Sequence, residues 1–270
     1  MPEIVEYRGV EALVAAEVMT DNETDGYTVG EVRSIAGVAE ISKATDSQSA
    51  AHYYDNIPAV VVQNTSSDTV TISASAIPLD VVGWLTGQTY DATTGALIEE
   101  TRVLKYFAIG YKTKKTNGDE VYVWRYKGSF NVPDQDNITE NDSTDANGQE
   151  LIYTGISTTK KFEKTGRGAK ALMVDVGKDL ADVSAFFSTV TTPDSLTAKA
   201  EYTLSITQAA STTVTVKKGS TTLANNDKIH AGDQLTITVT GGTVTVNSSA
   251  FISGDIHVVT GNTTVVSTAG

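Results

Sequence analysis

The pattern of apolar and polar residues is densest between Leu104 and Phe130. Two runs with the composition of strands, 104–113 and 120–130, flank a polar stretch that contains Asn117 and Gly118. Both residues tolerate positive φ, and the pair is a strong signal for a tight hairpin turn. Apolar residues lie on both faces of the first run, so both faces should be covered. The pattern predicts a hairpin in the middle of a packed sheet, with a lysine-rich tip in solvent.

One face of the second run is a row of aromatic side chains, Tyr122, Trp124 and Tyr126, while Val121 and Val123 lie on the other face. Aromatic side chains contribute most to stability when they are buried, so core is the more economical interpretation of this row. An exposed aromatic row would instead suit a carbohydrate-active enzyme or a lectin-like module.

The N-terminal patterns are less regular. Residues 1–30 are interpreted as an arm, in which 10–19 fits either a short helix or a strand. Residues 30–42 are expected to form a strand, although the alternation of apolar side chains is interrupted at Gly37.

Residues 43–58 show no sustained period, which predicts a long loop. Long loops inside a compact domain often bind something. The adjacent Tyr53 and Tyr54 favour a binding role for this loop, and the alternative is that they plug one end of the core.

Residues 68–76 alternate almost ideally between apolar and hydroxyl side chains, which predicts a strand with one packed face. The opposite face is small, hydroxylated and uncharged, and consists of Thr69, Thr71, Ser73 and Ser75. A shorter strand at 59–63 and a turn at 64–67 are expected before it.

A helix is predicted over 79–86. Pro78 and Asp80 suit its start, and Gly87 suits its end. This helix should cover one face of the central sheet.

Residues 133–150 are acidic and polar, and are expected to project into solvent. A calcium loop is disfavoured there, because Ser143 and Thr154 stand where such a loop needs acidic ligands. Strands are predicted at 151–162 and 170–177, followed by an amphipathic helix at 179–190.

The composition changes near residue 200. Thr, Val and Gly dominate the rest of the chain, and short runs with two-residue spacing alternate with glycine turns. This pattern predicts a small C-terminal β-sandwich of immunoglobulin-like size. The expected domains are therefore 1–199 and 200–270, with a linker at 193–199.

The charge balance and the scarcity of reactive side chains narrow the possible functions. The chain has 33 acidic and 20 basic residues, a net charge of −13, which disfavours binding to nucleic-acid phosphates. It has no cysteine, and its histidines, His52, His230 and His257, are far apart in the sequence. No catalytic, cofactor-binding or metal-binding motif is found, so catalytic, cofactor and metal sites are all predicted to be absent, and the protein is expected not to be an enzyme.

The start of the chain lacks the pattern of a signal peptide, and no run is long and apolar enough to span a bilayer. We therefore expect a protein made in a cytoplasm, with no membrane partner.

Three segments together resemble a known family. They are IPLDVVGWLTGQ, YFAIGYKTKKTNGDEVYVWRYKGSFNVP and KALMVDVGKDLADVSAFF followed by TTP. In this order and spacing they resemble the major tail protein family of long, non-contractile-tailed bacteriophages of Gram-positive hosts. The likeness covers roughly residues 5–193, and FAIGYKTKKTNGDEVYVWRYKG is its most specific part.

The resemblance implies a tail-tube β-sandwich or half-barrel with one or two short flanking helices, and a C-terminal immunoglobulin-like decoration. It also implies hexameric rings that stack into the tail tube of a virion assembled in the host cytoplasm. The expected partners are further copies of the chain, a tape measure protein, tail terminator and distal tail proteins, and genomic DNA that passes during ejection without specific binding. It implies no cofactor.

Two surfaces are predicted for such a tube. The contact between stacked rings is assigned to the nearly uncharged stretch Ala50, Ala51, His52, Tyr53, Tyr54, Asp55 and Asn56. The lumen is assigned to Thr69, Thr71, Ser73 and Ser75, because DNA should slide over hydroxyl groups without sticking. The alternative function is a bacterial cell-surface adhesin, which would need an export signal.

Overall fold

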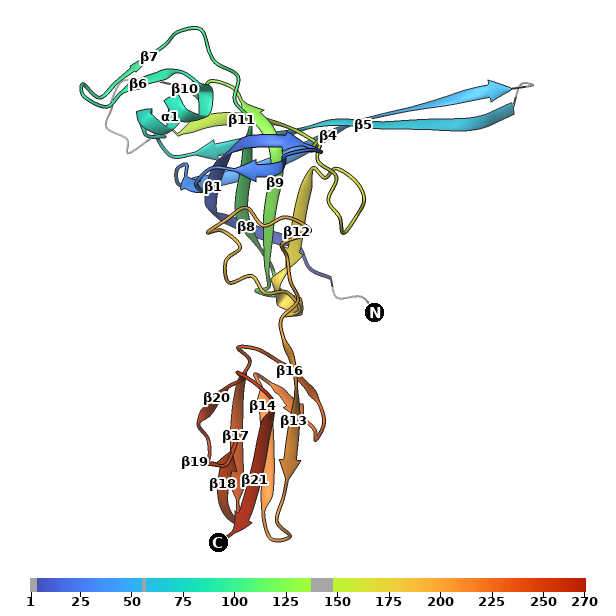
Figure 1. Cartoon of the computed structure of the whole chain (residues 1–270), viewed down its shortest axis with the longest axis vertical. Helices are drawn as coiled ribbons and strands as arrows, with labels where there is room; N and C mark the ends of the chain where they lie inside the picture. Colours follow the sequence, from blue (N-terminus) through green and yellow to red (C-terminus); the bar gives the residue numbers. More distant parts are fainter. Residues whose placement is uncertain (1–3, 55–56, 137–147) are drawn as a thin grey trace. The chain divides into compact units, whose positions relative to one another are not determined.

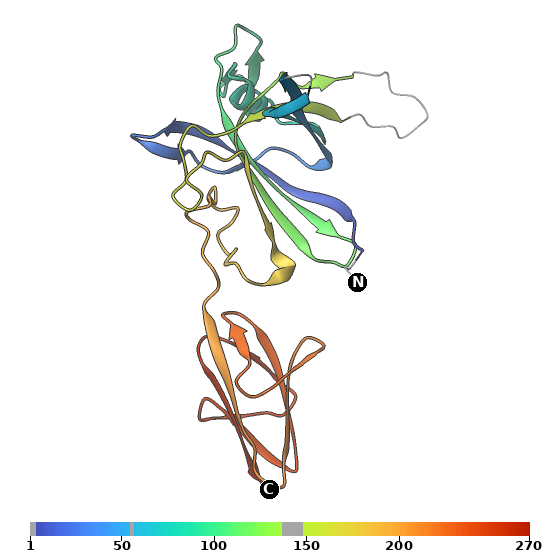
Figure 2. The same ribbon diagram turned by 90° about the vertical axis from the view of Figure 1, so that its right-hand side faces the viewer.

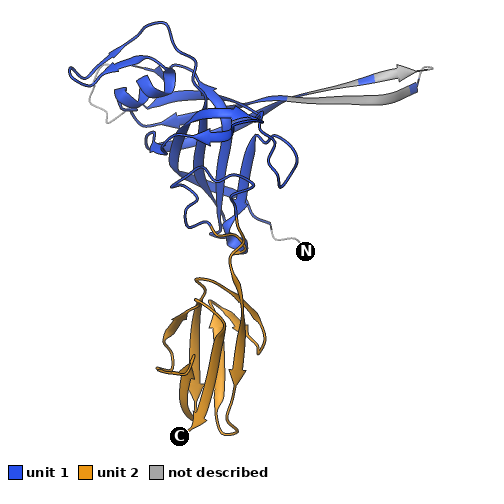
Figure 3. Cartoon of the chain, in the orientation of Figure 1, with its two compact units in different colours: residues 1–178, 183–196 blue, residues 179–182, 197–270 orange. Residues whose placement is uncertain are grey.

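The computed structural model describes residues 4–54, 57–136 and 148–270. These residues form mainly β structure, as predicted. The chain divides into two compact units, 1–178 with 183–196 and 179–182 with 197–270 (Figure 3). The predicted domain boundary lies between residues 199 and 200, whereas the continuous part of the second unit begins at Thr197.

The first unit is built on one large antiparallel sheet (Figure 1). Its strand order is β2 (Gly26–Val29), β1 (Tyr7–Asn22), β8 (Phe107–Lys115), β9 (Glu120–Phe130), β11 (Gln149–Ile156), β5 (Ile57–Ala74) and β4 (Val38–Tyr54). Three short strands pair off this path: β3 (Arg33–Ser34) with β1, β10 (Asp134–Gln135) with β11, and β12 (Ala171–Asp175) with β9.

The β8–β9 hairpin lies at the centre of the strand order, which confirms the strongest prediction from the sequence. Gly118 at its tip has a φ of +95°, a conformation that favours glycine. The interpretation of the N-terminal residues as an arm is wrong, because β1 pairs with β8 over most of its length (Figure 2). Positions 10–19 alternate too irregularly to reveal this, since β1 contains register shifts.

One face of the sheet packs against α1 (Leu79–Thr86), whose bounds are as predicted. Val81, Val82 and Leu85 of the helix join the core formed by Leu13, Val70, Ile72, Phe107, Ile109, Val123, Leu151 and Tyr153. The helix ends at Gly87 with a φ of +71°, where a Cβ atom would lie 2.0 Å from the Val103 carbonyl oxygen. Only glycine satisfies both constraints. The small strands β6 (Thr89–Asp91) and β7 (Ala96–Ile98) follow as a separate hairpin.

A bulge in β9 changes which side chains face this core. Ile109 pairs with Arg125, whereas Phe107 pairs with Gly128, so β9 holds one extra residue between these pairs. The extra residue reverses the alternation, because side chains on a strand change face at every residue. Phe130 therefore lies on the same face as Val123 and contacts Phe107, with ring centroids 5.7 Å apart.

The other face of the sheet is covered by the irregular segment that follows β12 and the 3₁₀ turn Val176–Lys178. The predicted helix at 179–190 is wrong: residues 184–190 form successive turns. Trp124 Nε1 donates to the Phe186 carbonyl oxygen at 2.7 Å, so that oxygen is held by the sheet instead of by a helical amide. Ser, Thr, Val and Phe, which make up most of this stretch, have only modest helix propensity.

Two predictions for the region of β4 and β5 are also wrong. Residues 43–58 are largely strand and not a loop, and 64–67 is not a turn, since β5 runs continuously through it. The polar residues at 64–67 lie at a register shift in the β4–β5 pairing, between the pairs Thr45–Asp68 and Ser47–Thr65. A bulge tolerates the same polar residues as a turn, which explains the misleading signal.

The second unit consists of two sheets around one core. The five-stranded sheet has the order β16 (Lys228–His230), β13 (Glu201–Thr207), β21 (Thr263–Ala269), β18 (Gly242–Val246) and β19 (Ser249–Phe251). The four-stranded sheet has the order β15 (Thr221–Leu223), β14 (Thr213–Lys218), β17 (Gln234–Thr240) and β20 (Ile256–Val258). Alternate residues of both sheets, such as Leu204, Val216, Ile237 and Val265, are fully buried, as the two-residue spacing predicts.

Candidate functional site

Strands β4 and β5 form the most unusual feature of the first unit. They pair with each other from Val38–Ala74 to Tyr54–Ile57, whereas β11 pairs only with residues 68–74 of β5. Among the described residues, the part of the hairpin at 45–67 therefore pairs only with itself, and both of its long edges lack a strand partner. Figure 1 shows this ribbon continuing beyond the rest of its sheet. We call it the distal ribbon.

The predicted inter-ring residues lie on this ribbon. Ala51 is exposed in β4, and Ile57, the first residue of β5, is 65% exposed. The side chains of Ala50, His52, Tyr53 and Tyr54 lie outside the described part of the structure, as do Asp55 and Asn56 entirely. Their assignment to a contact between rings stays a prediction.

The predicted lumen residues lie together on one face of the sheet. Thr69, Thr71 and Ser73 alternate with buried Val70, Ile72 and Ala74, and Ser75 follows just after the strand. The register places them in cross-strand rows, in which Ser73 lies between Glu40 and Glu150, Thr71 between Ser42 and Ile152, and Thr69 between Ala44 and Thr154. Asp134 extends the first row through its pairing with Glu150.

This surface is acidic and hydroxylated. Glu40, Glu150 and Asp134 are all exposed, and no lysine or arginine occupies the rows just described. We call it the acidic–hydroxyl face. Polyanions gain affinity by releasing counterions to protein cations, so a face without cations gives DNA little to bind.

The opposite face of the sheet carries a cavity of about 610 Å³. Its apolar wall includes Val10, Ile41, Tyr111, Val123 and Met173, and its charged lining includes Arg8, Lys43 and Arg125 with a single acid, Glu40. We call it the basic pocket. The pocket stands out because the chain as a whole has a net charge of −13.

A buried carboxylate, Asp68, pairs with two cations of the pocket, Arg125 and Lys43, and with Lys170 beside it. Asp68 accepts a hydrogen bond from Arg125 Nη1 at 3.0 Å and from Lys170 Nζ at 3.2 Å, and Lys43 Nζ lies 3.9 Å away. Burial alone would raise the pKa of Asp68, but the bond from Lys170 and the charges of Lys170 and Lys43 outweigh it and lower the pKa below its usual value. One carboxylate is thus shared by three cations, which leaves this part of the sheet with an excess of positive charge.

Arg125 is the least satisfied of these cations. Its side chain is 7% exposed, and its Nε is buried without an acceptor among the described residues. Buried donors are normally paired, so an unpaired one calls for an explanation.

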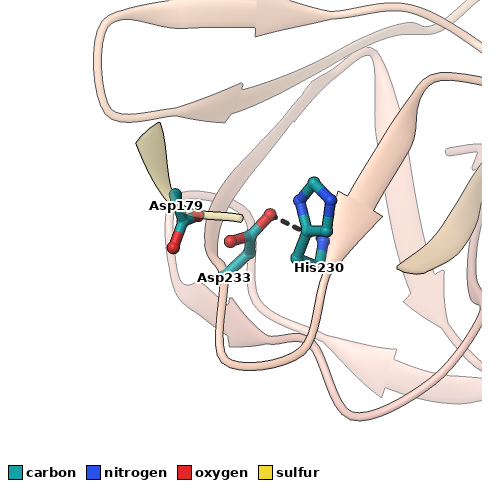
Figure 4. Close-up of side chains that lie close together, drawn as sticks. All are labelled: Asp179, His230 and Asp233. Carbon is teal, nitrogen blue, oxygen red and sulfur yellow. Dashed lines mark hydrogen bonds between the residues drawn. The ribbon is translucent and has the colours of Figure 1, made fainter. Parts of the chain in front are cut away.

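A cluster in the second unit brings together three potential metal ligands that sequence reasoning did not connect. Ligand atoms of Asp179, His230 and Asp233 lie within 4.8 Å of one another (Figure 4). The backbone N–H of His230 donates to Asp233 Oδ2 at 2.9 Å. Asp179 comes from a segment far away in the sequence, and no local spacing could have revealed it.

Cations of the protein already occupy this cluster. Lys218 Nζ lies 2.5 Å from Asp179 Oδ2 and 2.8 Å from Asp233 Oδ1, and Lys199 also pairs with Asp179. Burial raises the pKa of Asp179, but the bonds from Lys199 and Lys218 outweigh it and hold the pKa far below its usual value. A divalent ion here would have to displace an ammonium group, so the geometry suits an ion-pair network better than a metal centre.

The aromatic row of β9 belongs to the core. Trp124 and Tyr126 are fully buried, and Tyr122 packs against Phe186 and Phe187 with ring centroids 5.4 and 5.0 Å away. Tyr126 O–H donates to the Thr191 carbonyl oxygen at 3.0 Å. This arrangement confirms the interpretation of the row as core, with Tyr122 half-buried at its end.

The histidines do not meet in the described part of the chain. His230 belongs to the ion-pair cluster, His257 Nε2 lies 3.3 Å from Thr263 Oγ1, and the His52 side chain is outside the described residues. No helix among the described residues is long and apolar enough to cross a membrane.

No protein-family model matches this sequence, and a search of curated proteins finds no match either. The function is therefore inferred from the geometry together with the sequence resemblance.

Proposed function

We propose that this protein is the subunit of a bacteriophage tail tube, in which hexameric rings stack into the conduit through which DNA is ejected. The observation that carries the proposal is the distal ribbon, whose two long edges lack strand partners among the described residues. A protein that stays monomeric normally shortens, charges or covers such edges, because they template association. A subunit whose neighbours supply the missing pairing has no such need.

The acidic–hydroxyl face supports the same proposal. In the tube it would line the lumen with Thr69, Thr71 and Ser73, flanked by Glu40 and Glu150. Like charges repel the phosphates of passing DNA, and hydroxyl groups bind them only weakly, so the DNA could slide.

The second unit would decorate the outside of the tube. It has its own core, and its main part follows the first unit in the chain, so it can be added without interrupting the large sheet. The tape measure, terminator and distal tail proteins are the further partners that the proposal implies, and the virion is its location.

Electron microscopy of the purified protein tests the proposal. Negatively stained samples over a range of protein concentrations and salt concentrations should contain rings or tubes with a central channel. A protein that remains monomeric at high concentration, with its first unit folded, would contradict the proposal.

A further inference from the structure

Most residues of the basic pocket lie on the opposite face of the sheet from the acidic–hydroxyl face, and only Glu40, on the edge strand β4, belongs to both surfaces. The proposed lumen therefore leaves the role of the pocket unexplained. Its volume of about 610 Å³ falls within the range of cavities that take a ligand or an anchoring segment. Its lining combines apolar residues with three cations, Arg8, Lys43 and Arg125, and one acid, Glu40. An occupant should therefore combine apolar side chains with negative charge.

The unpaired Nε of Arg125 adds a second requirement. Because this donor is buried and lacks an acceptor among the described residues, an occupant that brings an oxygen to the pocket wall could draw the guanidinium into a new hydrogen bond. Carboxylate oxygens and the carbonyl oxygens of an unpaired strand edge are both suitable acceptors.

The distal ribbon meets these requirements in its sequence and its backbone. Residues 45–67 contain two acids, Asp46 and Asp55, and no lysine or arginine, together with a run of apolar residues from Ile57 to Val62. Both backbone edges carry groups without a strand partner among the residues that the structure describes, since β4 and β5 pair only with each other here.

The ribbon cannot enter the pocket of its own chain. Ile41 and Lys43 of β4 form part of the pocket wall, and the strand continues from them into the ribbon in an extended conformation. In Figure 1 the ribbon runs away from the sheet. The ribbon that fits the pocket must belong to another molecule.

We infer that the basic pocket of one subunit receives the distal ribbon of a second copy of this chain. The inference rests on the proposed function, for which it names the receiving surface of the contact between subunits. It is a strand-addition contact, in which backbone hydrogen bonds give affinity, while the pocket gives specificity.

Disulfide trapping between two single-cysteine proteins tests the inference, because the natural chain has no cysteine. One protein carries Met173→Cys, at a pocket residue that is 56% exposed. The other carries Ala51→Cys or Ile57→Cys, at exposed positions of the ribbon. Each pair is mixed, assembled and oxidised, and dimers are counted on a non-reducing gel.

A matched control keeps the test specific. Met19→Cys also replaces an exposed methionine, 64% exposed, in β1 but outside the pocket. We expect at least a tenfold excess of dimers with Met173→Cys over dimers with Met19→Cys for one or both ribbon positions. Equal yields would overturn the inference. It would also be overturned if Met173→Cys formed dimers with Ile98→Cys, a position outside the ribbon, and not with Ala51→Cys or Ile57→Cys.

Microscopy of the same samples separates this inference from the proposed function. Tubes that form without any cross-link from the ribbon to Met173→Cys would leave the proposed function standing and place the ribbon elsewhere. Failure of the unmodified protein to form rings or tubes would instead count against the proposed function itself.

Charge reversal gives an independent readout. Arg8→Glu places an acid at the exposed rim of the pocket, and Arg167→Glu is the control at an exposed site outside it. We expect Arg8→Glu to raise the protein concentration needed for tube growth several-fold. We also expect this concentration to depend less on salt in the variant than in the unmodified protein. An identical effect of the two variants would contradict a role for pocket charge.

Discussion

The indole Nε1 of Trp124, on the central strand of the sheet, donates a hydrogen bond to the carbonyl oxygen of Phe186 at 2.7 Å. Both residues are fully buried. This bond fastens a segment without regular structure across the face of the sheet opposite α1. The same oxygen also accepts a hydrogen bond from Thr191 Oγ1 at 3.3 Å, so polar contacts as well as packing hold this segment on the sheet.

Trp124→Phe should destabilise the first unit by about 2–4 kcal/mol, since it creates a cavity and leaves the buried Phe186 carbonyl oxygen with only the longer hydrogen bond from Thr191 Oγ1, at 3.3 Å. Trp84→Phe is the control, because Trp84 is only partly buried and its acceptor Glu17 keeps Lys105 as a partner. Urea unfolding followed by tryptophan fluorescence measures this directly. The only two tryptophans lie in the first unit, and each variant retains one of them. Equal losses in the two variants would contradict a special role for the Trp124 bond.

Asp68 should make the stability of the first unit depend on pH in the acid range. Its folded-state pKa lies below the unfolded value of about 3.9, so its contribution is present above that value and is lost as the pH falls through the folded pKa. Asp68→Asn should remove this part of the acid dependence and cost roughly 3–5 kcal/mol at neutral pH, because Arg125 then loses its buried partner.

The matched control is Asp46→Asn, at an exposed carboxylate on the same ribbon-forming hairpin. Urea unfolding at several pH values between 3 and 7 should show a smaller slope below pH 4 for Asp68→Asn than for the control. A slope identical to that of the unmodified protein would mean that Asp68 is not the titrating group.

Shortening the distal ribbon should separate folding from tube growth. Gln48 and Asn64 face each other in the ladder, so a short Gly-Ser bridge between them removes 49–63 without changing the register of the rest. We expect a folded first unit, with the unfolding midpoint nearly unchanged, and rings that do not elongate. Long tubes from this variant, seen by electron microscopy, would move the stacking contact to another element, such as the N-terminal residues or 133–150.

Truncation after Lys199 should leave assembly intact. It keeps the pairing of Asp182 and Leu180 with Thr197 and Lys199, and removes Lys218 and Asp233 from the ion-pair cluster. The large sheet and its core lie wholly before residue 199. Tubes of smaller diameter are expected by microscopy, whereas folded monomers that never assemble would show that the second unit is required.

Lysines on the acidic–hydroxyl face should make the tube retain DNA. Thr69→Lys with Thr71→Lys adds two cations to rows that have none, and Thr213→Lys with Thr215→Lys makes the same change on a strand of the second unit with matching exposure. DNA binding by assembled tubes should rise at low salt only for the first pair and fall steeply as salt increases. Equal binding by both pairs would place this face outside the lumen.

The sequence predicts best where local pattern and tertiary contacts agree. The β8–β9 hairpin and α1 carry their own turn, cap and alternation signals, and both lie where the pattern puts them. The alternation of Thr69, Thr71 and Ser73 with buried apolar residues was equally readable. These elements needed no information from distant parts of the chain.

The wrong predictions share a physical cause. Residues 43–58 and 64–67 look like loop and turn because their polar residues lack a period, yet β4 and β5 each supply the backbone partners that the other needs. The strand predicted at 59–63 between them is confirmed as part of β5. Residues 179–190 have helical spacing, but contacts with Trp124 and Tyr122 override it. The basic pocket and the Asp179 cluster combine residues from distant segments, so no local signal could locate them.

The strand order also sets the order in which the protein can form during synthesis. The β4–β5 ribbon needs only neighbouring sequence, whereas β1 must wait for β8, whose partner residues lie about a hundred positions later. Long-range pairing is the slow step in β-rich folds, so the ribbon should form early in the nascent chain, after the short β1–β2 hairpin at 18–29. Its open edges are then available to other chains before the core that anchors them exists. The contacts that can form early are therefore local and exposed, whereas the buried sheet that anchors the ribbon is completed last.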